Sequence, residues 1–273
     1  MRPPSKPLQL TARRWVAVPR GVAVGRPVGS LLSRGFSPGG LRAILLWFTG
    51  RRQLSRGPLG GTRRVKMARS NAGTCELCKR QASKSQMTRH VATCAADHDS
   101  SGTEESIVQF RIDAAGDPRY WLHVEARSEA PFQQLDSLLR HVWLECCGHM
   151  SAFRIGDSEL SMHAKIGSGL HRKGLVFTYE YDFGSTTTLS GHVLRTRKGR
   201  FGRAAVRLLA RNDAPAWRCE ECSQPATTVC PFCIHDGSYL FCEAHARKHP
   251  CAEEEVYLPV VNSPRMGVCG YVG

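Results

Sequence analysis

Eight cysteine and histidine residues with the spacing of metal ligands fall between positions 219 and 251. Two Cys-x2-Cys pairs come first, and a Cys-x2-His pair and a His-x-Cys pair follow. A Cys-x2-Cys turn lets two thiolates reach one metal ion at about 2.3 Å. If the pairs alternate between two tetrahedral sites, one ion is held by Cys219, Cys222, Cys242 and His245, and the other by Cys230, Cys233, His249 and Cys251.

Disulfides and cysteines packed in a core are the alternatives to metal binding here, and the number of ions, one or two, is open. Three ordered Cys/His pairs at this spacing favour zinc. Protein groups fill all four positions of each predicted site, so no position remains for an activated water and we expect structural zinc. The stretch from Cys242 to Cys251 resembles a B-box or related cross-braced finger, which predicts a zinc module at 217–251.

A further set of ligands, in the order Cys-x2-Cys-x11-His-x3-Cys, precedes this module and comprises Cys75, Cys78, His90 and Cys94. Ser85 is the expected N-cap of a helix on which Met87, His90, Val91 and Cys94 share one face, so the two distal ligands project together. This spacing predicts a Cys-Cys-His-Cys zinc finger at 67–98. The two modules together predict two to three structural zinc ions.

The net charge of +15 is unevenly distributed over the 273 residues. Residues 1–66 hold fourteen of the 38 Lys and Arg and no acidic residue, which leaves twenty-four basic against twenty-three acidic residues, or +1, for 67–273. The basicity therefore belongs to the tail and does not indicate a nucleic-acid-binding body. Nine of the twelve cysteines lie in metal-ligand patterns, which indicates a reducing compartment, and we expect a cytoplasmic protein.

Residues 1–66 are rich in Arg, Gly, Pro and Ser, and their apolar run at Leu41–Phe48 is too short to span a bilayer, so no membrane association is expected. Three interpretations remain open. The segment is a disordered tail able to bind polyanions, an organelle transit peptide, or upstream sequence from an over-extended start with Met67 as the initiator. We favour the last, because patterned sequence begins directly at Met67.

From Ser106 to about Asn212 the pattern is that of an α+β core, a mixed sheet with one packed amphipathic helix, flanked by the two zinc modules. Residues 107–112 and 120–126 alternate between apolar and polar and predict a hairpin. Pro131 marks the start of a helix whose apolar residues step by three and four up to Trp143. Further strands are expected at Met150–Ile155, Val176–Phe183, Thr186–Leu194 and Val206–Ala210.

Three stretches of this core are distinctive: Phe110-Arg-Ile, the helix end from Leu138 to Phe153, and Tyr179-Glu-Tyr-Asp-Phe-Gly184. On these residues, 104–213 resembles the Ri-plasmid open-reading-frame-three-like family, also catalogued as insertion-element passenger proteins of TnpR type. The resemblance implies a bacterial α+β domain of uncertain role, often borne on mobile elements. The family motif continues with an acidic residue, a Trp and a His, where this chain has Ser185, Thr187 and Leu189, which puts any site built from those side chains in doubt.

An enzymatic function has two sets of candidate residues. Asp182 and His192 could exchange protons, and Cys146, Cys147 and His149 could supply a thiol nucleophile. Asp182 equally fits the first position of a turn, and the two cysteines fit small packing residues, with a third metal or redox site as the alternative. No phosphate loop, nucleophile elbow or HExxH sequence occurs, so we expect no catalysis.

Two groups of cations could contact nucleic acid. The first lies beside the finger, and the second lies in a basic, glycine-containing loop at Thr196–Gly202, for which we favour the interpretation of a solvated hairpin tip over a binding loop. We expect weak, non-specific binding. The candidates are Lys79, Arg80, Lys84 and Arg89 in the first group, and Arg195, Arg197, Lys198, Arg200 and Arg203 in the second.

The C-terminal segment 252–273 contains few charges after Glu255, so we expect it to dock on the body, with Cys269 a buried thiol or a spare metal ligand. The sequence as a whole predicts a non-catalytic, zinc-binding adaptor or regulatory protein with an unidentified protein partner, associated with a mobile element. A nucleic-acid-binding accessory factor of a transposon or plasmid is the alternative, and an enzyme using Asp182 and His192 is the third possibility.

Overall fold

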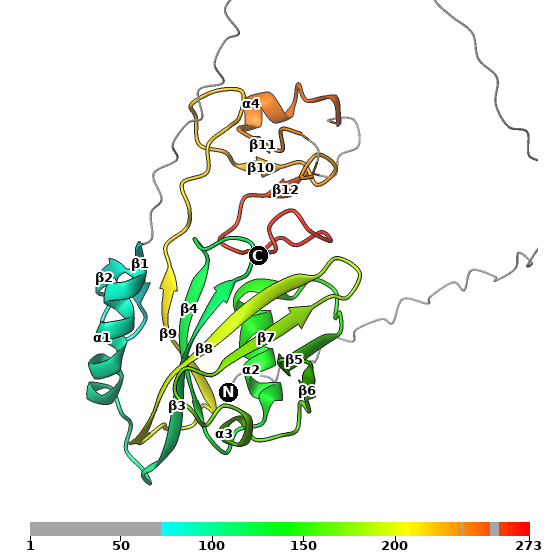
Figure 1. The fold of residues 1–273 in the computed structure, drawn as a ribbon. Coiled ribbons are helices and arrows are strands. Elements are labelled where there is room, and N and C mark those ends of the chain that lie inside the picture. The colour runs from blue at the N-terminus through cyan, green and yellow to red at the C-terminus, as the bar shows by residue number, and fades with distance from the viewer. Residues whose placement is uncertain (1–71, 236, 252–256) are drawn as a thin grey trace, which may run out of the picture. The chain divides into compact units, whose positions relative to one another are not determined.

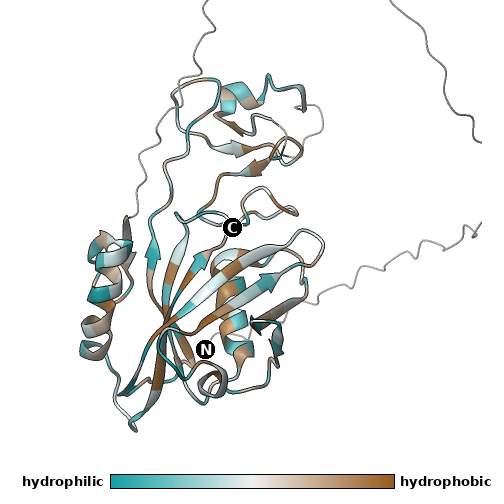
Figure 2. Cartoon of the chain, viewed as in Figure 1, coloured by the Kyte–Doolittle hydropathy of each residue, from teal (hydrophilic) through white to brown (hydrophobic). Residues whose placement is uncertain are grey.

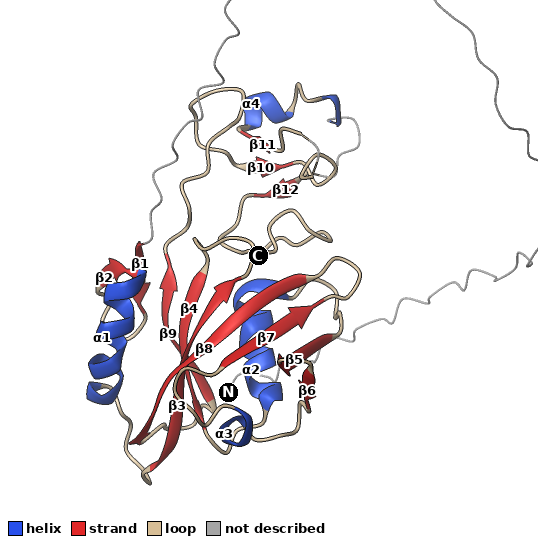
Figure 3. Cartoon of the chain, in the orientation of Figure 1, coloured by secondary structure: helices blue, strands red, loops and turns tan. Residues whose placement is uncertain are grey.

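The computed structural model describes residues 72–235, 237–251 and 257–273. The tail at 1–66 lies outside these ranges, so the predictions of disorder and of an over-extended start stay predictions. The described residues form an antiparallel sheet of nine strands in the order β2-β1-β9-β4-β3-β8-β7-β5-β6, and a second sheet in the order β11-β10-β12 (Figure 1). The expected α+β class is therefore correct, with the sheet antiparallel throughout the described residues (Figure 3).

The elements follow one another along the chain with few long connections. The large sheet consists of β1 (Ala72–Cys75), β2 (Gln81–Ser83), β3 (Glu105–Ala114), β4 (Trp121–Arg127), β5 (Ser151–Ile155), β6 (Ser158–Leu160), β7 (Val176–Tyr181), β8 (Thr187–Gly199) and β9 (Val206–Asn212). The small sheet consists of β10 (Thr228–Val229), β11 (Leu240–Phe241) and β12 (Leu258–Pro259). The helices are α1 (Lys84–Asp97), α2 (Phe132–Leu139) with a π-helical continuation η1 (Arg140–Leu144), α3 (Ile166–Gly169) and α4 (Glu243–Ala246).

Alternation along β4 assigns the two long helices to opposite faces of the large sheet. Successive side chains of a strand point to opposite faces. Leu122 and Val124 pack in the cluster that contains Phe132 and Leu135 of α2, whereas Trp121 packs in the cluster that contains Met87 of α1. Figure 2 shows apolar residues concentrated along α2 and the strands beneath it. The predicted hairpin at 107–126 is present as β3 paired with β4.

The first Cys/His segment is continuous with the large sheet. Its strand β1 pairs with β9, so that Thr74 lies opposite Arg211. Helix α1 begins after Ser83, whose side chain accepts a hydrogen bond from the Gln86 backbone while the Gln86 side chain bonds back to the Ser83 backbone. The expectation of Ser85 as N-cap is thus wrong, because this reciprocal capping box favours the earlier serine.

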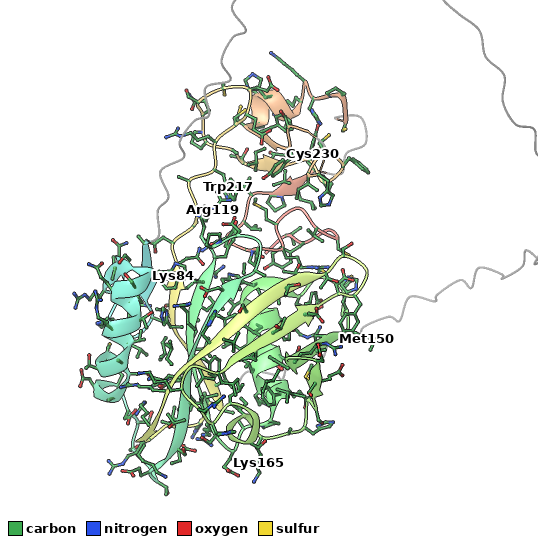
Figure 4. The ribbon with its side chains drawn as sticks, in the orientation of Figure 1. Lys84, Arg119, Met150, Lys165, Trp217 and Cys230 are labelled. Atoms are coloured by element: carbon green, nitrogen blue, oxygen red, sulfur yellow. The ribbon has the colours of Figure 1, made fainter. Side chains whose placement is uncertain are left out.

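Residues 257–273 contact both the small sheet and the main core, whereas 252–256 lie outside the described residues. Strand β12 pairs with β10 of the small sheet, and Met266 packs in the main core cluster. Ser263 Oγ donates a 2.6 Å hydrogen bond to the Trp143 carbonyl at the end of η1. A cation–π contact joins the large sheet's β3–β4 connection to the start of the C-terminal zinc module, since the Arg119 guanidinium lies 4.1 Å from the ring centroid of Trp217 (Figure 4). No helix among the described residues is long and apolar enough to cross a membrane.

Candidate metal centres

The finger ligands come from a tight turn and a helix. Cys75 ends β1 and Cys78 lies in the following turn, which is closed by a 2.9 Å hydrogen bond from the Cys75 N–H to the Arg80 carbonyl. His90 and Cys94 lie one helical turn apart on α1. The Cys75 and Cys94 Sγ atoms are 3.9 Å apart, and Cys78 Sγ lies 3.1 Å from His90 Nε2. The four predicted ligands therefore face a common point.

The eight ligands of the second module also gather into two groups, with the pairing that the sequence spacing predicts. In the first group, His245 Nδ1 lies 3.4 Å from Cys219 Sγ and 3.3 Å from Cys242 Sγ, and the Cys222 and Cys242 sulfurs are 3.9 Å apart. Cys242 and His245 of this group lie at the start of α4 and within it. Cys219 and Cys222 come from the first Cys-x2-Cys pair of the module.

The second group of the module is assembled in the same way. Cys233 Sγ lies 3.3 Å from His249 Nε2 and 3.8 Å from Cys251 Sγ. Cys230 follows β10 directly and completes the group of four. The His249 ring also stacks at 4.5 Å from the ring of Phe241, which is buried. Strand β10 thus positions Cys230, and the contact with Phe241 positions the His249 imidazole.

These separations fit a tetrahedral metal ion. Four ligands at about 2.3 Å for sulfur and 2.0–2.1 Å for nitrogen have Sγ–Sγ edges of roughly 3.8 Å and Sγ–N edges of roughly 3.5 Å. In each of these three groups the four ligand atoms lie within 4.8 Å of one another. The three Cys/His groups could therefore hold metal ions without any change of fold.

The local electrostatics of the thiols differ between the groups. A hydrogen bond from the Arg80 backbone lowers the pKa of Cys78, while burial raises the pKa of Cys94 to about 12. For Cys219, burial raises the pKa, but backbone hydrogen bonds, including one from Cys242, outweigh it and bring the pKa to about 6. A metal ion binds the thiolate form of cysteine. Because protons compete for the same sulfur, the affinity of these sites for metal must fall as the pH is lowered.

A fourth group consists of Cys146, Cys147, His149 and Cys269, which agrees with the alternative interpretation of a further metal site at the two adjacent cysteines and of Cys269 as a spare ligand. The prediction that Cys146 and Cys147 are packing residues holds for Cys146, which is half-buried against the main core, and is wrong for Cys147, which is exposed. The prediction of a buried Cys269 thiol is also wrong, since this residue is exposed. The signal available in the sequence was the Cys-Cys-x-His cluster itself, but its fourth member lies 120 residues further along the chain.

The acid/base pair considered for catalysis does not form. Asp182 follows the end of β7, whereas His192 pairs with Val176 at the other end of this strand. Asp182 accepts a 3.0 Å hydrogen bond from the Gly184 N–H, as expected of the first residue of a turn. A pocket lined by Glu105, Arg127 and Phe201 contains neither residue. The proposed pairing of Asp182 with His192 is therefore wrong.

The predicted basic loop is also wrong in part, because Arg195, Arg197 and Lys198 belong to β8. Arg197 binds Asp99 at 2.7 Å and the fully buried Glu125 at 3.2 Å, and Arg195 Nε donates to Gln109 at 2.7 Å. These two guanidinium groups serve the interior of the fold. The candidate nucleic-acid contacts that are exposed are Lys79, Arg80 and Arg89 at the finger, and Lys198, Arg200 and Arg203 at the end of β8 and just after it.

The finger lysines are likewise engaged with carboxylates. Lys84 Nζ lies 2.6 Å from Asp113 Oδ1, and this pair is mostly shielded from water (Figure 4). Lys79 Nζ lies 2.8 Å from Glu76 Oε2 on the exposed surface. An exposed pair of this kind is weak and leaves the cation accessible. The structure therefore leaves exposed cations at the finger and, as Lys198, Arg200 and Arg203, at the end of β8 and just after it.

Comparisons with known proteins give a limited result. No protein-family model matches the chain, and no curated protein matches it, so the resemblance of 104–213 to the Ri-plasmid open-reading-frame-three-like family stays a prediction. Among solved structures, a protein of unknown function, MM3350 from Methanosarcina mazei Go1, is similar at 15% sequence identity and a TM-score of 0.35. The match covers 41% of this chain and 76% of that one.

Proposed function

We propose that this chain is a zinc-binding, non-catalytic adaptor whose Cys/His centres maintain a surface for a protein partner. The observation that carries this proposal is that each of the three predicted ligand groups supplies four protein ligands around one point. A tetrahedral ion so enclosed has no open position for water or substrate, which is typical of structural zinc. Thiolate and imidazole donors favour Zn²⁺ over Mg²⁺ or Ca²⁺, which prefer oxygen.

The partner surface is proposed at the end of the sheet where β5 begins and β7 ends. Met150 and Phe183 are 74% and 52% exposed, and a 2.9 Å hydrogen bond from Asp182 N to the Met150 carbonyl places the backbones of these two segments side by side; Met150 is labelled in Figure 4. Two large apolar side chains exposed at neighbouring positions are typical of a contact surface. A protein partner is the best match to this chemistry, whereas nucleic acid requires clustered free cations. An association with a mobile element rests only on the resemblance of 104–213.

The metal part of the proposal is tested by elemental analysis of protein prepared under reducing conditions. We expect at least three zinc ions per chain, and loss of folded structure at 217–251 on chelation, because a module this small cannot bury enough apolar surface alone. Cys230→Ser should remove one ion, while Ser223→Ala, an exposed change in the same module, should remove none. Protein that contains no zinc would contradict the proposal.

The adaptor part is tested by affinity capture from the native host. A true partner should be lost when Met150 and Phe183 are both changed to Ser. It should be retained in Val176→Ser, a control that is also exposed but lies at the opposite end of β7. Equal capture by all three proteins would rule out this surface. Capture of a defined DNA sequence at physiological salt would instead favour a nucleic-acid factor.

A further inference from the structure

We propose that Cys146, Cys147, His149 and Cys269 form a fourth metal site, which takes Zn²⁺ or a similarly soft divalent cation and fastens the C-terminal segment to the core. This site extends the zinc proposal to residues outside both predicted modules. It joins the end of η1 to a turn that follows the buried Arg265. The site is independent of the partner surface.

The distances within the group match those of the three predicted sites. His149 Nε2 lies 3.0 Å from Cys147 Sγ and 3.1 Å from Cys269 Sγ. The Cys147 sulfur lies 3.7 Å from that of Cys269 and 3.8 Å from that of Cys146. A disulfide requires about 2.05 Å between sulfurs, whereas a tetrahedral zinc ion requires roughly 3.8 Å. The group is therefore already spaced for a metal ion.

Both ligand-bearing turns adopt backbone conformations that present the side chains to this point. Gly148 has a φ of 78°, and its N–H donates a 2.6 Å hydrogen bond to the Glu145 carboxylate, which closes the turn around Cys146 and Cys147. Cys269 has a φ of 50°, in the left-handed region that a residue with a Cβ rarely adopts. Strained conformations of this kind persist where the surrounding structure or a function holds them.

A buried carboxylate orients the histidine. His149 Nδ1 lies 3.5 Å from Asp182 Oδ1, on the side of the ring opposite to the nitrogen that faces the thiols. The other oxygen, Asp182 Oδ2, accepts a 2.6 Å bond from Arg265 Nη2. Histidines that bind metals commonly face a carboxylate with their second nitrogen, which fixes the tautomer and the ring orientation. This relation selects Nε2 as the ligand atom of His149.

Exposure distinguishes this site from the others. Cys147 and Cys269 are exposed, whereas each of the other three groups includes at least one buried cysteine. Solvent and chelators therefore reach the proposed ion more directly. We expect it to exchange faster than the remaining zinc, so that it is the first ion that a weak chelator removes.

The test is metal counting on the full-length chain, reduced, loaded with Zn²⁺ and freed of unbound metal. We expect four ions in the wild type and three in Cys269→Ser. Cys147→Ser, which changes the other segment, should also hold three, and the double variant should again hold three, because both residues bind one ion. Val272→Ser is a control at an exposed neighbour that is not a ligand, and it should hold four.

Cobalt(II) loading supplies a second readout, since the intensity of its visible absorption reports tetrahedral thiolate coordination. The difference between wild type and Cys269→Ser should equal one tetrahedral cobalt. An equal metal count in the wild type and in Cys269→Ser would overturn the fourth site while leaving the three-site proposal standing.

Discussion

Arg265 and Asp182 form a buried ion pair between segments 83 residues apart in sequence, with Nη2 and Oδ2 separated by 2.6 Å. The Arg265 side chain is fully buried, and it also donates to the Ser185 carbonyl and to Thr187 Oγ1, each at 3.1 Å. The hydrogen bond from Arg265 lowers the pKa of Asp182 to about 2. This pair couples the C-terminal segment to the turn between β7 and β8.

Asp182→Asn should destabilise the protein by about 3–5 kcal/mol, because it leaves the guanidinium buried without a counter-charge. Asp157→Asn, at an exposed turn, should change stability by no more than about 0.5 kcal/mol. Chemical denaturation of both variants, loaded equally with zinc, measures the difference. Equal stabilities would show that water reaches Arg265 in the variant.

Glu125→Gln should cost a similar amount, about 3–5 kcal/mol, because Glu125 is fully buried between Arg197 and Arg207. Glu180→Gln is the matched control, since Glu180 pairs with Arg154 at 3.3 Å on a partly exposed face and should contribute at most about 1 kcal/mol. Denaturation midpoints measured at one salt concentration compare the two. A larger loss for Glu180→Gln would contradict the assignment of Glu125 as the centre of the network.

His123 should make stability depend on pH. Burial lowers its pKa to about 3, from an ordinary value near 6.5. Below pH 6.5 the unfolded chain therefore binds a proton that the folded chain does not, so the free energy of unfolding falls as the pH is lowered. Relative to His123→Gln, the wild type should lose about 2 kcal/mol between pH 7 and pH 5.

The measurement for His123 compares the two proteins across this window, so that acid effects on the metal centres cancel. His141→Gln changes an exposed histidine and is the control, which should follow the wild type. A stability difference between wild type and His123→Gln that stays constant with pH would mean that folding does not lower the pKa of His123.

Neutralising Lys198 and Arg200 to Gln should reduce any duplex-DNA binding and lower its log–log salt slope by at most about 2, since each phosphate contact contributes roughly 0.9. Both side chains are exposed, so stability should be preserved. Arg197→Gln should mainly destabilise the fold, because its guanidinium contacts Asp99 and Glu125. Binding titrations at several salt concentrations, paired with unfolding curves, separate the two effects.

Local patterns in the sequence were sufficient for the hairpin of β3 and β4 and for the three predicted ligand groups, because their information lies in alternation or in short spacings. The helix ending in η1 was expected from its apolar stripe, but its π-helical turn has no local signal. The role of Arg197 was not predictable, since its partners Asp99 and Glu125 are distant in sequence and no local charge count reveals them. The fourth ligand group could be foreseen only as two separate alternatives, a metal site at the adjacent cysteines and a spare ligand at Cys269, because Cys269 reaches Cys147 only through the folded C-terminal segment.

The pairing of Asp182 with Arg265 sets a delay during synthesis of the chain. Asp182 leaves the ribosome 83 residues before Arg265, which at roughly 5–20 residues per second amounts to about 4–17 s. For most of this interval β7 and β8 exist without the cation that neutralises the carboxylate at their turn. The Asp182 side chain is therefore covered and paired only after residue 265 has emerged, and in a nascent chain stalled before that point it should remain open to water.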